Sequence, residues 1–224
     1  MRNDEGKWHP LLQDIRIQLT RGMDGEVSTQ QRQLGLEYKV NFGVNILRLK
    51  DIAKDLPHDE ELADLMWTSE SREMRLLSIM IRDPHSLSHD KVLSIIKETD
   101  TLELSEQLVF VLLRRLPYAI SLLKELFQME IDVSIPPATI RYLLLNHMVL
   151  NEQLTPEVFK AFISVITRDF TDPCFYHIAT IHNCLQKIVF DRPDLPMHDI
   201  CNAVIAKGDS GTKALAEDLL TLIE

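Results

Sequence analysis

The recurrence of Leu and Ile at spacings of three and four, from one end to the other, most constrains what this chain can fold into. That spacing is the period of an amphipathic helix, and the alternation typical of half-buried strands is almost absent. Only 7 glycines occur among 224 residues, and the 10 prolines stand between the helical segments or in their first turns. The sequence therefore predicts an all-α protein.

The periodic segments are short and are joined by short connections, each opening near a residue type that caps helix N-termini. The predicted helices are 10–21, 28–38, 46–56, 58–66, 69–82, 88–99, 103–115, 117–128, 136–148, 156–168, 173–190, 197–206 and 210–223. The expected caps are Ser28, Ser69, Ser88, Thr155 and Ser210. Helices so short and numerous favour an α-solenoid, a superhelix of stacked antiparallel helix pairs, over a four-helix bundle. HEAT-like repeats are the class that tolerates the degenerate period seen here.

No Ser/Gly-rich or Pro-rich linker divides the chain. We therefore expect one HEAT-like domain over residues 1–224, with a bend near the loop MEIDVSIPP at 129–137.

The start of the chain, MRNDEGKWHPLL, lacks the basic n-region and apolar run of a signal peptide. The longest apolar clusters, such as LVFVLL at 108–113, fall short of the ~20 residues that a membrane helix needs. The three cysteines, Cys174, Cys184 and Cys201, form no CxxC pair and leave an odd thiol under any disulfide scheme. These features predict a cytoplasmic protein with no membrane partner.

The formal net charge of −10 argues against a nucleic-acid partner unless the cations gather on one face. Arg72, Arg75 and Arg82 do share an arc of about 80° on their helix, at 100° per residue. Guanidinium groups match phosphate oxygens, so this stripe is a candidate for phosphate contact. The alternative is local ion pairing with Glu73, Glu70 or a neighbouring helix, and the same two interpretations apply to Arg114 and Arg115.

The helix expected at 46–56 carries Arg48, Lys50 and Lys54, but these cations are scattered around it. The ordered feature of this helix is its apolar face.

Two short patterns resemble chemical motifs without satisfying them. GDSGTK at 208–213 lacks both the phosphate-loop spacing and the partners of a serine nucleophile, and we expect it to end one helix and cap the next. His177, His182 and Cys184 are not spaced to place three ligands on one helical face. The sequence therefore predicts no metal site and no cofactor.

Three segments together indicate a family. NFGVNILRLKDIAKDL at 41–56, DEELADLMWTSESREMRLLSIMIRDP at 59–84 and EQLVFVLLRRLPYA at 106–119 resemble the DNA alkylation repair family of HEAT-like helical proteins. The resemblance covers roughly residues 12–128, where the chain is similar to a divergent member of that family.

The resemblance implies a solenoid whose cationic face holds duplex DNA and, in active members, removes N3- or N7-alkylated bases. A carboxylate then stabilises the developing oxocarbenium sugar. Active members place this Asp four positions after a Trp, and the matching stretch SIIKETDTLELSEQ at 94–107 offers Asp100, with Ile96 in the tryptophan position. Of the two tryptophans, Trp8 and Trp67, the latter is expected to be a packing residue.

The resemblance thus makes Asp100 the candidate catalytic carboxylate, although TDT before a helix is also ordinary capping chemistry. The candidate DNA contacts are Arg72, Arg75, Arg82, Arg114 and Arg115. A second hypothesis keeps the solenoid and replaces the DNA surface by an acidic one, giving a non-catalytic scaffold that binds a protein partner.

Overall fold

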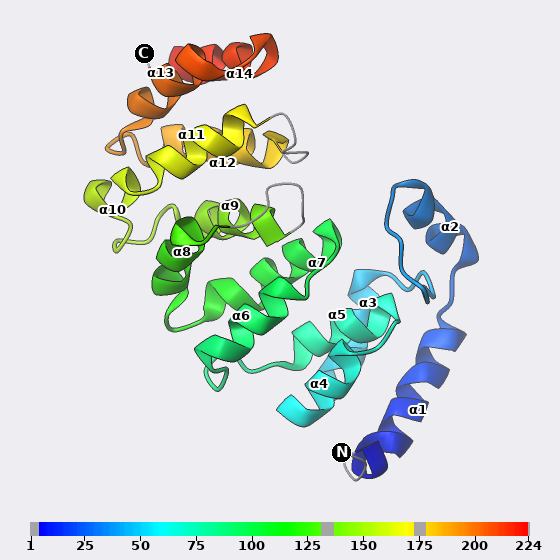
Figure 1. Ribbon diagram of the computed structural model, residues 1–224. Helices are drawn as coiled ribbons and strands as arrows, with labels where there is room; N and C mark the ends of the chain where they lie inside the picture. Colours follow the sequence, from blue (N-terminus) through cyan, green and yellow to red (C-terminus); the bar gives the residue numbers. More distant parts are fainter. Residues whose placement is uncertain (1–4, 131–136, 173–177, 224) are drawn as a thin grey trace. The chain divides into compact units, whose positions relative to one another are not determined.

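The computed structural model describes residues 5–130, 137–172 and 178–223, and every regular element in these ranges is helical (Figure 1). Within them, the strand-like contact is one isolated bridge between Val40 and Ser71. The all-α prediction is confirmed.

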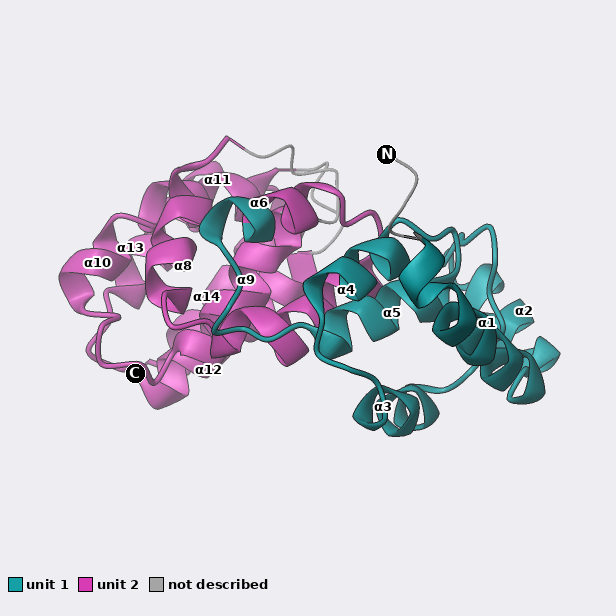
Figure 2. Ribbon diagram, turned by 90° about the horizontal axis from the view of Figure 1, so that it is seen from below, with its two compact units in different colours: residues 1–92 teal, residues 93–224 magenta. Residues whose placement is uncertain are grey.

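The chain divides into two compact units, residues 1–92 and residues 93–224 (Figure 2). The single continuous domain stays a prediction, and most of the expected bend at 129–137 lies outside the described residues.

Unit 1 contains the helices of the first two family-like segments. They are α1 (Glu5–Arg21), α2 (Gly25–Gln33), α3 (Ile46–Lys54), α4 (Glu60–Trp67) and α5 (Arg72–Ile81), and α6 (His89–Lys97) crosses the boundary. Helix α5 packs against both α3 and α4. Its buried side chains occupy nearly every position, because α5 has a neighbour on two sides.

Unit 2 continues with helices stacked in pairs. They are α7 (Leu102–Gln107), η1 (Leu108–Leu112), η2 (Leu113–Arg115), α8 (Ala119–Gln128), α9 (Pro137–Met148), α10 (Pro156–Lys160), α11 (Ile163–Thr171), α12 (Ile178–Asp191), α13 (Met197–Lys207) and α14 (Ser210–Thr221). Helix α12 packs against α9 and α14, and α11 packs against α13. These contacts define two layers, an α9–α12–α14 layer and an α11–α13 layer, as in HEAT-like repeats.

Side-chain caps open most helices, although not always at the predicted residue. Thr155 is the predicted cap of α10, and its hydroxyl accepts from the Val158 N–H at 3.4 Å. Three other predicted caps are wrong by one to four residues. Helix α2 is capped by Asp24 and not Ser28, α5 by Ser71 and not Ser69, and α14 by Asp209 and not Ser210. Ser28 instead lies inside α2, where its hydroxyl donates to the Asn41 carbonyl at 3.1 Å.

A buried carboxylate in unit 1 joins two of the family-like segments. Glu73, fully buried at the start of α5, accepts the N–H groups of Phe42 and Val44 at 3.2 and 3.3 Å. Arg72 lies beside it and donates to the Val44 carbonyl at 2.9 Å and to the Glu73 carboxylate at 3.1 Å. The segment before α3 is therefore held to α5 by charge-assisted hydrogen bonds in a dry environment.

Gly43 allows this close approach of the backbone. Its φ is +72°, a left-handed conformation, and a Cβ at this position would lie 2.0 Å from the Asp24 carbonyl oxygen. Only glycine fits both conditions, so the NFG part of the first family-like segment is explained by packing.

The helix predicted at 103–115 is interrupted in the structure. After α7, the backbone forms one π turn, η1, and then one 3-10 turn, η2. A π turn inserts a residue into the helical register and rotates the residues after it, and such turns are frequent at functional sites. Phe110 in η1 and Arg114 in η2 are exposed although the run around them is apolar.

Among the described residues, no helix combines the length and the apolar character that crossing a bilayer requires.

Candidate nucleic-acid interface

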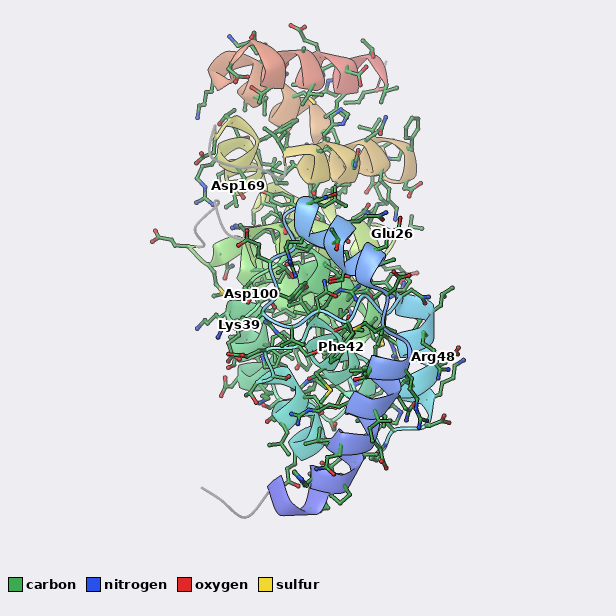
Figure 3. All side chains as sticks on the ribbon, turned by 90° about the vertical axis from the view of Figure 1, so that its right-hand side faces the viewer. Glu26, Lys39, Phe42, Arg48, Asp100 and Asp169 are labelled. Atoms are coloured by element: carbon green, nitrogen blue, oxygen red, sulfur yellow. The ribbon has the colours of Figure 1, made fainter. Side chains whose placement is uncertain are left out.

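Asp100, the candidate catalytic carboxylate, lies exposed in the connection between α6 and α7 (Figure 3). The neighbouring Thr101 is the N-cap of α7 and accepts from the Leu104 N–H at 3.2 Å. Ile96, in the position where the family places tryptophan, is 2% exposed and belongs to the core. This position therefore provides no aromatic wall beside the carboxylate.

Two arginines of the predicted stripe are not at the surface. Arg72 is 1% exposed and Arg82 is 2% exposed. Arg82 donates to the Glu60 carboxylate at 2.6 Å and to Asp64 at 2.7 Å. Both guanidinium groups are enclosed in ion pairs, as the alternative interpretation had it. The contact of Arg72 and Arg82 with DNA stays a prediction that their burial does not support.

Arg75, the third member of the stripe, is half-buried. Its guanidinium lies over the ring of Trp67 at 4.7 Å from the centroid, and Trp67 is 5% exposed. Trp67 is thus a packing residue, as predicted. The arc shared by the three arginines faces the helices that cover α5, so it does not form a surface stripe.

The cations of α3 are also as scattered as the sequence indicates. Arg48 is exposed, and Lys54 pairs with Asp51 at 2.8 Å. The hydrogen bond from Lys54 lowers the pKa of the Asp51 carboxyl.

Arg114 and Arg115 differ from the arginines of α5 because both are exposed. The Arg114 guanidinium lies over the ring of Phe110 at 4.2 Å, and Arg115 donates to the Val111 carbonyl at 3.4 Å. Phe110 itself is 43% exposed. An arginine stacked on an exposed aromatic ring presents a flat, positively charged surface.

Two more residues extend this surface. The His147 ring, at the end of α9, lies 5.9 Å from the Phe110 ring, and Lys187 of α12 donates to the carbonyl of the adjacent Asn146 at 2.8 Å. We call Phe110, Arg114, His147 and Lys187 the Phe110 patch. All four belong to elements of unit 2.

The Phe110 patch is locally positive although the chain is acidic. Burial lowers the pKa of His147 from its ordinary 6.5, and the charges of Arg114 and Lys187 lower it further. His147 is therefore neutral near pH 7 and offers a stacking ring under the influence of two cations. Aromatic rings of this kind stack on bases, and the cations contact phosphates.

The sequence did not single out Phe110, His147 or Lys187. Phe110 is hidden in the apolar run LVFVLL, where nothing distinguishes an exposed ring from a core one. His147 and Lys187 come from helices 40 residues apart in the chain, and only packing brings them to Phe110. The adjacent pair Arg114 and Arg115 was the feature of the sequence that indicated this surface.

A buried polar network lies in the same unit. Asp169 is fully buried, accepts from the Tyr142 hydroxyl at 2.5 Å and from Arg168 at 2.8 Å, and is labelled in Figure 3. Arg141, also fully buried, lies 3.7 Å from the same carboxylate. Burial and the neighbouring Asp169 raise the pKa of Tyr142 well above 10, so its hydroxyl stays a donor.

We expect Tyr142→Phe to lower the free energy of unfolding of unit 2 by about 1–3 kcal/mol, because Asp169 then loses a donor inside a dry core. Urea unfolding followed by far-UV circular dichroism checks this. A loss below about 0.5 kcal/mol contradicts a structural role for the hydrogen bond.

The remaining motifs have structural roles. Asp209 caps α14 by accepting from the Thr212 N–H at 2.8 Å, so GDSGTK is a helix junction, as predicted. His182 lies 3.7 Å from Asp218, while His177 and Cys174 lie outside the described residues. Burial raises the pKa of Cys184 to about 12 and of Cys201 to about 11. In the described part of the chain, no three His, Cys, Asp or Glu side chains gather as a metal site.

No family model and no curated protein matches this chain. A solved structure described as "a new family of proteins related to the HEAT-like repeat DNA glycosylases with affinity for branched DNA structures" matches with a TM-score of 0.66 and 15% identity. The match covers 93% of this chain and 94% of the other. At this identity it demonstrates a shared fold, and at that level it confirms the resemblance seen in the sequence. The chain therefore has the helical-repeat fold of the proteins related to the HEAT-like repeat DNA glycosylases.

Proposed function

We propose that this protein binds DNA through the Phe110 patch. The observation that carries the proposal is the exposed Phe110 ring with Arg114 stacked on it at 4.2 Å and the neutral His147 ring 5.9 Å away. Base stacking on an aromatic ring contributes about 1–3 kcal/mol per base, and each cation that neutralises a phosphate adds an electrostatic contribution.

Two further observations support DNA as the partner. The charges that act on His147 are both positive, so the patch attracts anions although the whole chain carries −10. The solved structure with the same fold is described as having affinity for branched DNA, and an exposed ring suits DNA whose bases are partly unstacked, as at a branch point.

The proposed function is binding without base excision. An excising member of the family uses an aromatic wall beside its carboxylate, whereas Ile96 of this chain is a core residue and Asp100 is exposed. An oxocarbenium-like transition state gains little from an exposed carboxylate, because the high dielectric near the surface weakens the attraction.

We expect Asp100→Asn and the wild-type protein to release equally little 7-methylguanine from methylated duplex, at the level of a protein-free control. The unfolding free energies of the two forms should agree within about 0.5 kcal/mol, since the residue is exposed. Release by the wild-type protein that Asp100→Asn abolishes would reject this expectation and make Asp100 the catalytic residue.

The binding proposal is tested by fluorescence anisotropy with end-labelled linear duplex and with a labelled four-way junction, at about 50 mM salt, where phosphate-driven binding is strong. We expect binding that weakens steeply as salt rises. If the protein binds neither DNA at this salt, the proposal is overturned. The better hypothesis is then the non-catalytic scaffold that binds a protein partner.

A further inference from the structure

A second cationic surface lies on the other helix layer of unit 2, in an open groove between α11 and α13. The groove has a volume of about 630 Å³. The charged and hydroxyl side chains that line it include Lys160, Ser164, Thr167, Arg168, Asp199 and Lys207. Residues Thr167, Arg168 and Thr171 follow one face of α11, and Asp199, Ala203 and Lys207 follow one face of α13 at intervals of four.

The groove carries an excess of positive charge. Its lining contains three cations and one carboxylate, Asp199. Arg168 is partly engaged, since its Nε and Nη2 donate to the buried Asp169 at 2.9 and 2.8 Å. Lys160 and Lys207 are exposed, and neither forms an ion pair with any residue in the described ranges. The charge of Lys160 acts on the Glu157 carboxylate, but neither lysine is held in an ion pair, so both can contact an anion without breaking one.

The Thr167 hydroxyl is an independent sign that the groove is adapted to a polar ligand. Thr167 is 5% exposed, and its Oγ1 has no hydrogen-bond partner among the described residues. Its backbone carbonyl, in contrast, accepts from the Thr171 hydroxyl at 2.8 Å. Buried hydroxyl groups almost always have a partner, so an unpartnered one in the wall of a groove points to a ligand that supplies it.

The groove and the Phe110 patch belong to different layers. The groove lies on α10, α11 and α13, whereas the patch lies on η1, η2, α9 and α12. The two surfaces share no residue, and they lie on separate helix pairs, α11 with α13 and α9 with α12.

We infer that the groove between α11 and α13 binds the sugar–phosphate backbone of a second DNA arm, so that a branched DNA engages both this groove and the Phe110 patch. The Lys160 and Lys207 ammonium groups contact the phosphate oxygens, and the Thr167 hydroxyl donates to one of them. This inference rests on the proposed function, because the first arm lies on the Phe110 patch.

The test compares a four-way junction with a linear duplex for the variant Lys160→Ala/Lys207→Ala. We expect its affinity for the junction to fall about tenfold near 0.1 M salt, with a salt slope lower by about 2, one for each lysine that no longer reaches a phosphate. Its affinity for the linear duplex should stay within about twofold. The matched control Lys54→Ala/Lys213→Ala removes the same charge from α3 and α14 and should bind both DNAs as the wild-type protein does.

A second measurement tests the chemistry of the groove without DNA. Titration of the wild-type protein with inorganic phosphate should shift the amide NMR signals of Thr167 and Arg168, and the groove variant should lose these shifts while keeping its circular dichroism spectrum.

The outcomes separate this inference from the proposed function. Unchanged junction binding by the groove variant, equal losses for junction and duplex, or no phosphate-dependent shift overturns the inference while DNA binding stands. A wild-type protein that binds neither DNA overturns both. Shifts caused by a phosphoserine peptide but not by a DNA oligonucleotide would assign the groove to a phosphorylated protein instead, and would also reject the second-arm role.

Discussion

Replacing Glu73 by alanine is expected to lower the free energy of unfolding of unit 1 by about 3–5 kcal/mol, the usual cost of removing one partner from a buried ion pair. The carboxylate is fully buried and accepts from the backbone N–H groups of Phe42 and Val44 and from Arg72. Its loss leaves these donors facing a cavity in a dry core. A stability loss of this size is a large part of the roughly 5–15 kcal/mol typical of a domain.

The two tryptophans of the chain make this measurement specific. Trp8 and Trp67 both lie in unit 1, so the fluorescence change on urea unfolding reports that unit, whereas circular dichroism reports both. The matched control is Glu70→Ala, because Glu70 is an exposed carboxylate three residues away that pairs with Lys39 at the surface. We expect the control to cost at most about 1 kcal/mol. Equal losses for both variants would show that Glu73 has no special structural role.

The second large effect concerns DNA binding. We expect Phe110→Ala/Arg114→Ala to weaken binding of both duplex and junction by about 1–3 kcal/mol, roughly 5- to 150-fold, because the stacking surface disappears. The salt slope should fall by about 1, since Arg114 no longer neutralises a phosphate. Because Phe110 is 43% exposed, its truncation removes little core packing, and the melting temperature should change little.

The control for this variant is Leu47→Ala/Arg48→Ala. It also removes one exposed apolar side chain and one exposed arginine, from α3 of unit 1; Leu47 is 74% exposed. We expect the control to retain wild-type affinity, since the cations of α3 form no cluster. If both variants lose the same affinity, binding follows total charge, and the Phe110 patch is not the interface.

Most of the fold was predictable from the sequence because helix formation depends on local patterns. The three- and four-residue spacing of Leu and Ile marked the apolar faces, and residues such as Thr155 marked helix starts. The errors in the predicted caps have the same origin, because a local pattern does not distinguish between two capping residues that lie close together. Ser69 and Ser71 are equally good caps by composition, and the choice of Ser71 goes with the hydrogen bonds that tie the first turn of α5 to the segment 40–44.

The candidate site was predictable only in part. A helical wheel arranges side chains around their own helix, so the shared arc of Arg72, Arg75 and Arg82 was visible in the sequence. Which side of α5 is covered depends on α3 and α4, and these helices turn that arc inward. Arg114, in contrast, follows the π turn and lies at the surface, over the ring of Phe110.

The sequence by itself thus determined the helical class and the approximate helix bounds. Tertiary packing alone decided which cations reach solvent and which rings join them, as in the approach of His147 and Lys187 to Phe110. The physical reason is that backbone hydrogen bonding in helices acts between near neighbours in the chain, whereas burial and local charge depend on surfaces contributed by residues far apart in it.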